Sequence, residues 1–115
     1  MNATEIIREA ARLMRAHAAD VCPSPWTVTS QSARYGAVVG QPGDEFPEDN
    51  GYGGHLIGES MSPASAAYVV AWEPAVALSV AAWLEACADS NGVAPHALAV
   101  AKAYLANPLA AAVAS

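Results

Sequence analysis

Two residues four positions apart, His55 and Glu59, form the best acid–base pair in this sequence of 115 residues. Histidine changes its charge near neutral pH, and a nearby carboxylate can assist it in general acid–base catalysis. No nucleophile with a recognisable setting accompanies them: Ser60 lacks the G-x-S-x-G pattern, and Cys22 and Cys87 have no flanking signature. The sequence therefore favours a protein without catalytic residues, and a small enzyme using His55 and Glu59 stays an alternative.

Four carboxylates fall within six residues of the predicted loop 41–54: Asp44, Glu45, Glu48 and Asp49. Calcium and other hard cations bind several carboxylates on one loop. These acids do not alternate at the first, third and fifth positions before a glycine, and Pro47 stiffens the middle of the run. We therefore expect no metal and no cofactor, and we interpret the four acids as a solvated surface for a protein partner.

Aromatic and basic residues on either side of this loop suggest a different class of function. Arg34 and Tyr35 precede the loop, and Tyr52 and His55 lie at its end. An oligomer that holds these four residues between its chains would sequester a small signalling molecule, which is the second alternative.

Acidic residues outnumber basic ones, with 11 Asp and Glu against 5 Lys and Arg, and the net charge is -6. Neutralising nucleic-acid phosphates or anionic lipids requires clustered Lys and Arg, so we expect neither nucleic acid nor a membrane as partner. Charges from Glu5 to Arg15 leave no uncharged stretch for a signal peptide. Cys22 and Cys87 fit no zinc pattern and are expected to stay reduced. Together these features predict a cytoplasmic protein.

The order of patterns predicts a helix, short strands and then a helical half. Asn2, with Glu5 three residues later, fits a capping box before an amphipathic helix to Ala19. Pro63 opens a helix through Trp72, and Pro74 either kinks this helix or starts another that runs to about residue 89. The other expected elements are strands at 26–31, 35–39 and 55–59 and a last helix at 96–106. Trp26 is expected to anchor the first hairpin to the helical half.

The predicted C-terminal helices are apolar around most of their circumference. Between Ala75 and Ala88 the only polar side chains are Ser79 and Glu85. A helix of this kind must be covered on more than one side, and one hairpin and one N-terminal helix cannot cover three of them. We therefore expect a homo-oligomer, most simply a dimer, through helices between residues 64 and 106, with an interface at Trp72, Val76, Val80, Trp83 and Tyr104.

Two stretches of the sequence carry a family resemblance. Cys22-Pro23-Ser24-Pro25-Trp26-Thr27-Val28 resembles the T-P-G-P-W-x-V segment of small actinobacterial and actinobacteriophage proteins of unknown function, with Cys22 and Ser24 in place of the threonine and glycine. Residues 66–78, AAYVVAWEPAVAL, are similar to their A-x-[HYF]-I-A-x-x-x-P-x-x-x-L element. Ead-like proteins of enteric phages have the same order of elements. The resemblance implies a phage or prophage accessory protein in a bacterial host, with no known catalytic residues.

These observations combine into one set of expectations. The chain is predicted to be a single small α+β domain over residues 1–108, with an N-terminal helix, a hairpin or three-stranded antiparallel sheet and an Ala-rich helical half. Residues 109–115 are expected to form a frayed tail. The predicted function is non-enzymatic binding, to itself and to a host protein.

Overall fold

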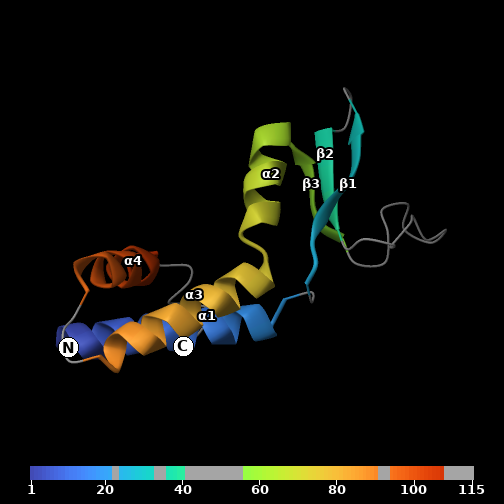
Figure 1. Cartoon of the computed structure of the whole chain (residues 1–115). Helices are drawn as coiled ribbons and strands as arrows, with labels where there is room; N and C mark the ends of the chain where they lie inside the picture. The colour runs from blue at the N-terminus through green and yellow to red at the C-terminus, as the bar shows by residue number, and fades with distance from the viewer. Residues whose placement is uncertain (22–23, 33–35, 41–55, 91–93, 108–115) are drawn as a thin grey trace. The chain divides into compact units, whose positions relative to one another are not determined.

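The computed structural model describes residues 1–21, 24–32, 36–40, 56–90 and 94–107. Over these ranges the elements are α1(Ala3–Ala19), β1(Thr27–Ser32), β2(Gly36–Gly40), β3(Leu56–Met61), α2(Pro63–Ala71), α3(Pro74–Ala88) and α4(Pro95–Leu105) (Figure 1). The chain divides into two compact units. Unit 1 comprises Met1–Val21 and Ala77–Ser115, and unit 2 comprises Cys22–Val76.

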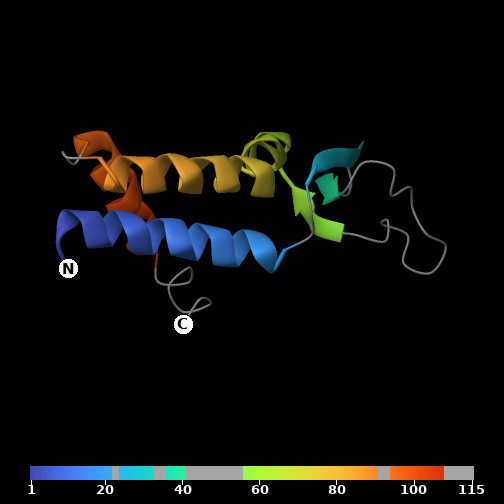
Figure 2. The same cartoon turned by 60° about the horizontal axis from the view of Figure 1, so that its bottom comes forward.

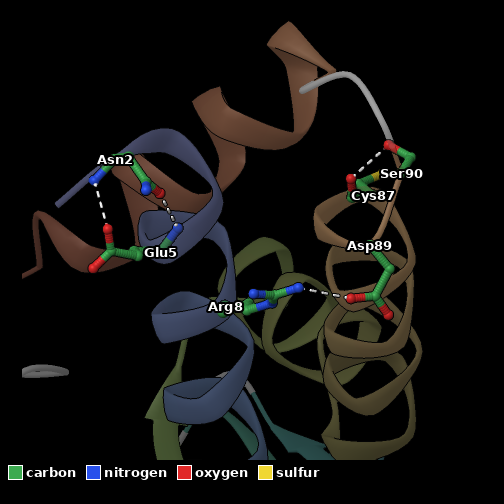
Figure 3. A network of polar contacts seen from close by, with 6 residues as sticks. All are labelled: Asn2, Glu5, Arg8, Cys87, Asp89 and Ser90. Atoms are coloured by element: carbon green, nitrogen blue, oxygen red, sulfur yellow. Dashed lines mark hydrogen bonds and ion pairs between the residues drawn. The ribbon is translucent and has the colours of Figure 1, made fainter.

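The first residues of unit 1 fix the start of α1. Asn2 Oδ1 accepts a hydrogen bond from the Glu5 backbone N–H at 2.8 Å, and Glu5 Oε1 accepts one from the Asn2 backbone N–H at 3.2 Å (Figure 3). This reciprocal arrangement satisfies backbone donors that the first turn of a helix leaves free. The predicted capping box is confirmed. The buried stripe of α1 consists of Ile7, Ala10, Ala11, Leu13 and Met14.

The core of unit 1 lies between α1, α3 and α4. From Ala77 onward α3 runs beside α1 in the opposite direction, as both views show (Figures 1 and 2), and α4 packs on α1. Ile7 and Leu84 are its fully buried large side chains. Its other buried members are Ala10, Ala11, Met14, Ala81, Ala88, Ala97 and Ala101. Alanine buries little area, so this core gains less hydrophobic free energy per residue than one built from Leu and Ile.

Unit 2 contains a three-stranded antiparallel sheet in the order β1-β2-β3. The hairpin pairs Ser32 with Gly36, where β2 begins. Gly36 has φ +73°, and a Cβ atom there would lie 2.8 Å from the Met61 carbonyl oxygen. Glycine alone meets both demands, since it adopts positive φ at no steric cost and lets β3 approach β2 closely. The central strand β2 buries Ala37 and Val39 completely.

Helix α2 lies on this sheet (Figure 1). Ser62 Oγ accepts a hydrogen bond from the Ser65 backbone N–H at 3.1 Å, and Pro63 occupies the first helical position, as expected. Ala66 is fully buried against Ala37 and Val39. The partly buried side chains around this second core are Trp26, Val28, Ile57, Met61, Val69 and Val70. Trp26 therefore joins the hairpin to α2, which agrees with the expected anchoring role.

A break at Trp72-Glu73 separates α2 from α3. Helix α2 ends at Ala71 and α3 begins at Pro74, so Pro74 starts a new helix rather than kinking a continuous one. Ser24 contributes to this start, because its Oγ accepts a hydrogen bond from the Ala75 backbone N–H at 2.8 Å. Ser24, which lies 51 positions earlier in the sequence, thus caps the N-terminus of α3 with its side chain.

The α+β class, the N-terminal helix and the three-stranded sheet are confirmed. Observed boundaries differ from the expected ones by one or two residues, as at β1, which spans Thr27–Ser32, and β3, which spans Leu56–Met61. A single domain over residues 1–108 stays a prediction beside the division into two units. The expected tail 109–115 and the loop 41–54 lie outside the described residues.

Candidate interaction surface

Helix α2 exposes two aromatic side chains one turn apart. Tyr68 is 68% exposed and Trp72, at the C-cap, is 54% exposed. Their ring centroids are 6.3 Å apart and the rings are tilted by 44°, a favourable geometry for an aromatic pair. Large exposed aromatic side chains are enriched at protein interfaces because they supply apolar area with few rotatable bonds. The Tyr68–Trp72 pair is therefore the strongest candidate contact on α2.

Helix α3 exposes a second apolar face. Its centre is lined by small exposed side chains at spacings of four, three and four residues: Ala75, Ser79, Ala82 and Ala86. Because successive residues are 100° apart around a helix, Val76 and Trp83 lie on one flank of this line and Leu78 lies on the other. These three side chains are 36%, 44% and 40% exposed. We call this set of seven residues the α3 face.

The residues predicted to form an oligomer interface fall into two groups. Trp72, Val76 and Trp83 are exposed, as an interface with another chain requires. Val80 and Tyr104 are partly buried against the core of unit 1. Tyr68 and Leu78 were absent from the predicted set although they are exposed. Tyr68 lies on the side of α2 opposite to buried Ala66, whereas Leu78 lies only about 60° around α3 from buried Ala81, so no periodicity in the sequence separates Leu78 from the core.

Tyr104 has a partner within its own unit. Its hydroxyl lies 2.5 Å from Nδ1 of His17, and the two ring centroids are 5.7 Å apart. His17 is in the last turn of α1, and Tyr104 belongs to α4. Burial raises the pKa of the Tyr104 hydroxyl above its ordinary value, because the phenolate would lose hydration. The pair therefore fastens α4 to the end of α1.

A row of three arginines lines an open groove on unit 1, with a volume of about 540 Å³. Arg8 bonds Asp89 at 2.9 Å, a contact visible in Figure 3, and Arg15 bonds Glu85 through two nitrogens at 3.1 and 2.5 Å. Arg12 forms a similar two-nitrogen contact with Glu9, one turn away on α1. Each guanidinium thus has a carboxylate, so the row adds no net positive charge.

These contacts change the pKa values of the carboxylates. Hydrogen bonds from Arg12 lower the pKa of Glu9, and those from Arg15 lower the pKa of Glu85, because both stabilise the ionised form. Arg8–Asp89 and Arg15–Glu85 link α1 to α3 at the surface of unit 1. All of these side chains are substantially exposed, so each pair contributes little to stability and is weakened by salt.

The other predicted site residues lie outside the described part of the chain. They are the ligand-site set Arg34, Tyr35, Tyr52 and His55 and the acidic set Asp44, Glu45, Glu48 and Asp49. Glu59, the carboxylate proposed beside His55, is an exposed residue of β3. Among the described side chains, no three of His, Cys, Asp or Glu gather into a set able to hold a metal ion.

No single helix among the described elements is long and apolar enough to cross a membrane. Helices α2 and α3 pass this test only when the two are taken together across the break between them. In comparisons with known proteins, the chain matches no family model, no curated protein and no solved structure. The features that point to a function are therefore the exposed apolar side chains of α2 and α3.

Proposed function

We propose that this chain is a non-enzymatic binding protein that works as a homo-oligomer, most simply a dimer, and contacts a host protein. Its place would be the cytoplasm of a bacterium that carries it on a phage or prophage. The phage origin is supported by the sequence resemblance in residues 22–28 and 66–78 alone. The binding function is supported by the surface of the chain itself.

One observation carries the proposal: large apolar side chains on two successive helices are open to solvent. Tyr68, Trp72 and Trp83 are each between 44% and 68% exposed. Single exposed apolar residues are common on any protein, but an exposed aromatic residue accompanied by further exposed apolar residues on the same helix marks an interaction surface. The chain has one phenylalanine, three tryptophans and four tyrosines in total, so three of its eight large aromatic side chains are open to solvent here.

The two binding activities are assigned to different places. Self-association uses α3, whose exposed line of small side chains lets a second helix approach. Binding of a host protein uses the Tyr68–Trp72 pair of α2, with the acids at 44–49 attracting a basic partner. This division allows the two activities to be removed separately.

Light scattering after size exclusion tests the first activity. A chain of 11.8 kDa that dimerises should show an average mass that rises towards at least twice this value as the concentration increases through the micromolar range. A monomer at the highest concentration reached would contradict self-association.

Affinity capture from host lysate tests the second activity. The bait is the wild-type chain, beside a Tyr68→Ser/Trp72→Ser variant and a control, Val100→Ser, which changes an exposed apolar residue of α4. Interface aromatics contribute a large share of binding energy, so a specific host protein should be retained by the wild type and the control and lost from the double variant. Equal capture by all three baits would remove α2 as the partner surface.

A further inference from the structure

We propose that two copies of this chain pair through their α3 faces with the two helices antiparallel, and that the two-fold axis passes between Ser79 and Ala82. The inference rests on the proposed self-association and specifies how it is achieved. It follows from the spacing, the symmetry and the area of the α3 face.

The spacing of the small residues fits close packing of two helices. Ala75, Ser79, Ala82 and Ala86 follow one another at four, three and four positions. This alternation has a mean period of 3.5 residues, the repeat that keeps one line of a helix facing a partner helix. Small side chains along the line let the axes come to about 8 Å, the short end of the range for packed helices. The central line of small residues thus allows a second helix to pack closely against α3.

The face is also complementary to itself when one copy is reversed. An axis between positions 79 and 82 places Ala75 level with the partner's Ala86, and Ser79 level with the partner's Ala82. In an antiparallel pair related by a two-fold axis, the flank of α3 that carries Val76 and Trp83 contacts the same flank of the partner helix. Trp83 therefore packs beside the partner's Val76, and symmetry repeats this contact at the other end of the pair. An isologous interface requires this self-matching.

The area available agrees with a weak, transient dimer. The exposed side chains of the α3 face, of which Trp83 is the largest, provide on the order of 400 Å² per copy. Two copies would bury on the order of 800 Å², the size of a transient interface rather than a permanent one. We therefore expect an equilibrium between monomer and dimer in the micromolar range, with Trp83 of each copy as the main contact.

A second copy suits this face better than a lipid surface does. Helices α2 and α3 contain no Lys or Arg; their one charged residue is Glu85, and Glu73 lies in the break between them. Amphipathic helices that bind anionic membranes carry basic residues on their polar face. The net charge of -6 adds repulsion from such a surface.

Disulfide cross-linking tests the direction of pairing in the full-length chain. The background carries Cys22→Ser and Cys87→Ala, and each variant adds one cysteine: Ala75→Cys, Ala82→Cys, Ala86→Cys or the control Ala99→Cys on an exposed position of α4. With a rise of 1.5 Å per residue, two copies of position 82 are offset by about 4.5 Å along the helices, whereas two copies of position 75 are offset by about 16 Å. Only the first separation is compatible with a disulfide.

The expected pattern is distinctive. Ala82→Cys should form a covalent dimer on mild oxidation, and Ala75→Cys and Ala86→Cys should not do so alone but should cross-link to each other when mixed. Ala99→Cys should stay monomeric on a denaturing gel. Self-linking at 75 and at 86, with no mixed product, would show a parallel pair and overturn the geometry while leaving self-association standing. A monomer by light scattering would overturn both.

A matched pair of charge variants gives a second readout that needs no cysteine. Ala82→Glu places two carboxylates on either side of the proposed axis, and Ala99→Glu adds the same charge to an exposed alanine of α4. We expect Ala82→Glu to weaken dimerisation at least tenfold in sedimentation equilibrium, with helix content unchanged, and Ala99→Glu to leave it within twofold. Equal dissociation constants would overturn the proposal. Binding of the α3 face to lipid would also overturn the proposal. In that case phosphatidylcholine vesicles would shift the Trp fluorescence of the wild type to shorter wavelength, and Ala82→Glu would abolish this shift while the dimer persists.

Discussion

At the scale of single residues, Ser24 illustrates how a distant side chain sets the start of a helix. Its Oγ accepts the Ala75 backbone N–H at 2.8 Å, one of the donors that the first turn of α3 leaves free. Ser24→Ala should lower the free energy of unfolding by about 1 kcal/mol, the usual cost of a lost cap. Chemical denaturation followed by circular dichroism measures it. Ser24→Thr, which keeps an oxygen acceptor, is the control and should lose less; equal losses would contradict the capping role.

Trp26 is expected to stabilise the contact between the hairpin and α2. Its ring is partly buried against the core that Ala66, Val69 and Val70 of α2 share with the sheet. A fully buried Trp changed to Ala costs about 3 to 5 kcal/mol, so the partly buried ring should cost about 2 kcal/mol. Trp26→Phe retains most of the apolar area and should cost clearly less. A loss within experimental error for Trp26→Ala would show that the hairpin is held to α2 by other contacts.

These two residues also explain what the family-like stretches do in the molecule. Residues 22–28 contain Ser24 and Trp26, and residues 66–78 contain Ala66 and Ala75, which are their partners. Both stretches therefore contribute to the packing of unit 2. Spacing along the chain revealed the stretches, but not their mutual contact, because a pairing across 51 positions depends on the tertiary fold.

At the scale of elements, local chemistry made the helices predictable. Asn2 with Glu5, Ser62 with Pro63, and Pro95 act within one turn of the helix that they begin, so the sequence located α1, α2 and α4 to within about one residue. The choice at Pro74 between a kink and a new helix stayed open, because a proline is compatible with both. Pairings between elements, such as His17 with Tyr104, had no local signal at all.

The ion pair between α1 and α3 gives an element-scale prediction about pH. Arg15 lowers the pKa of Glu85 below its ordinary value of 4.5 in the folded protein. The pair therefore adds its full stabilisation above the unfolded pKa, and this stabilisation disappears as the pH falls through the lowered value. Thermal unfolding should show a smaller loss between about pH 5 and pH 3 for Glu85→Gln than for the wild type, by a modest amount because both side chains are exposed.

The control for this measurement is Glu59→Gln, which removes an exposed carboxylate from β3 in the other unit. It should leave the acid dependence of unit 1 unchanged. Added salt should reduce the difference between wild type and Glu85→Gln, since exposed ion pairs are screened. Identical acid profiles for wild type and Glu85→Gln at low salt would mean that Arg15 and Glu85 do not stabilise the α1–α3 pair.

At the scale of the whole molecule, composition limited the partners more than it identified them. A large share of alanine and a net charge of -6 made a thin core, exposed apolar helices and a poor match to nucleic acid predictable. The residues of the proposed interface could be predicted from the sequence only in part. Exposure at Trp72, Val76 and Trp83 matches an interface, whereas Val80 and Tyr104 are partly covered by unit 1, because neighbours distant in sequence decide which side of an apolar helix is covered.

The final prediction concerns the four acids at positions 44, 45, 48 and 49, which supply four of the eleven carboxylates of the chain. Like charges so close in sequence repel one another and stay hydrated, so they should add little to folding, while their field accelerates encounter with a basic partner. Replacing all four by Asn or Gln should leave the melting temperature nearly unchanged. It should also slow association with the captured host protein, mainly in the on-rate, and flatten the salt dependence of that rate.

A metal site would behave in the opposite way, because an ion that binds only the folded chain raises its melting temperature by mass action. The decisive measurement is therefore thermal unfolding of the wild type and of the quadruple variant, each with and without millimolar calcium or magnesium chloride. We expect the curves of each protein to coincide, since the acids lack the spacing of a calcium loop and Pro47 stiffens their centre. A rise of several degrees in the wild type that the variant lacks would make residues 44–49 a metal site instead of a steering surface.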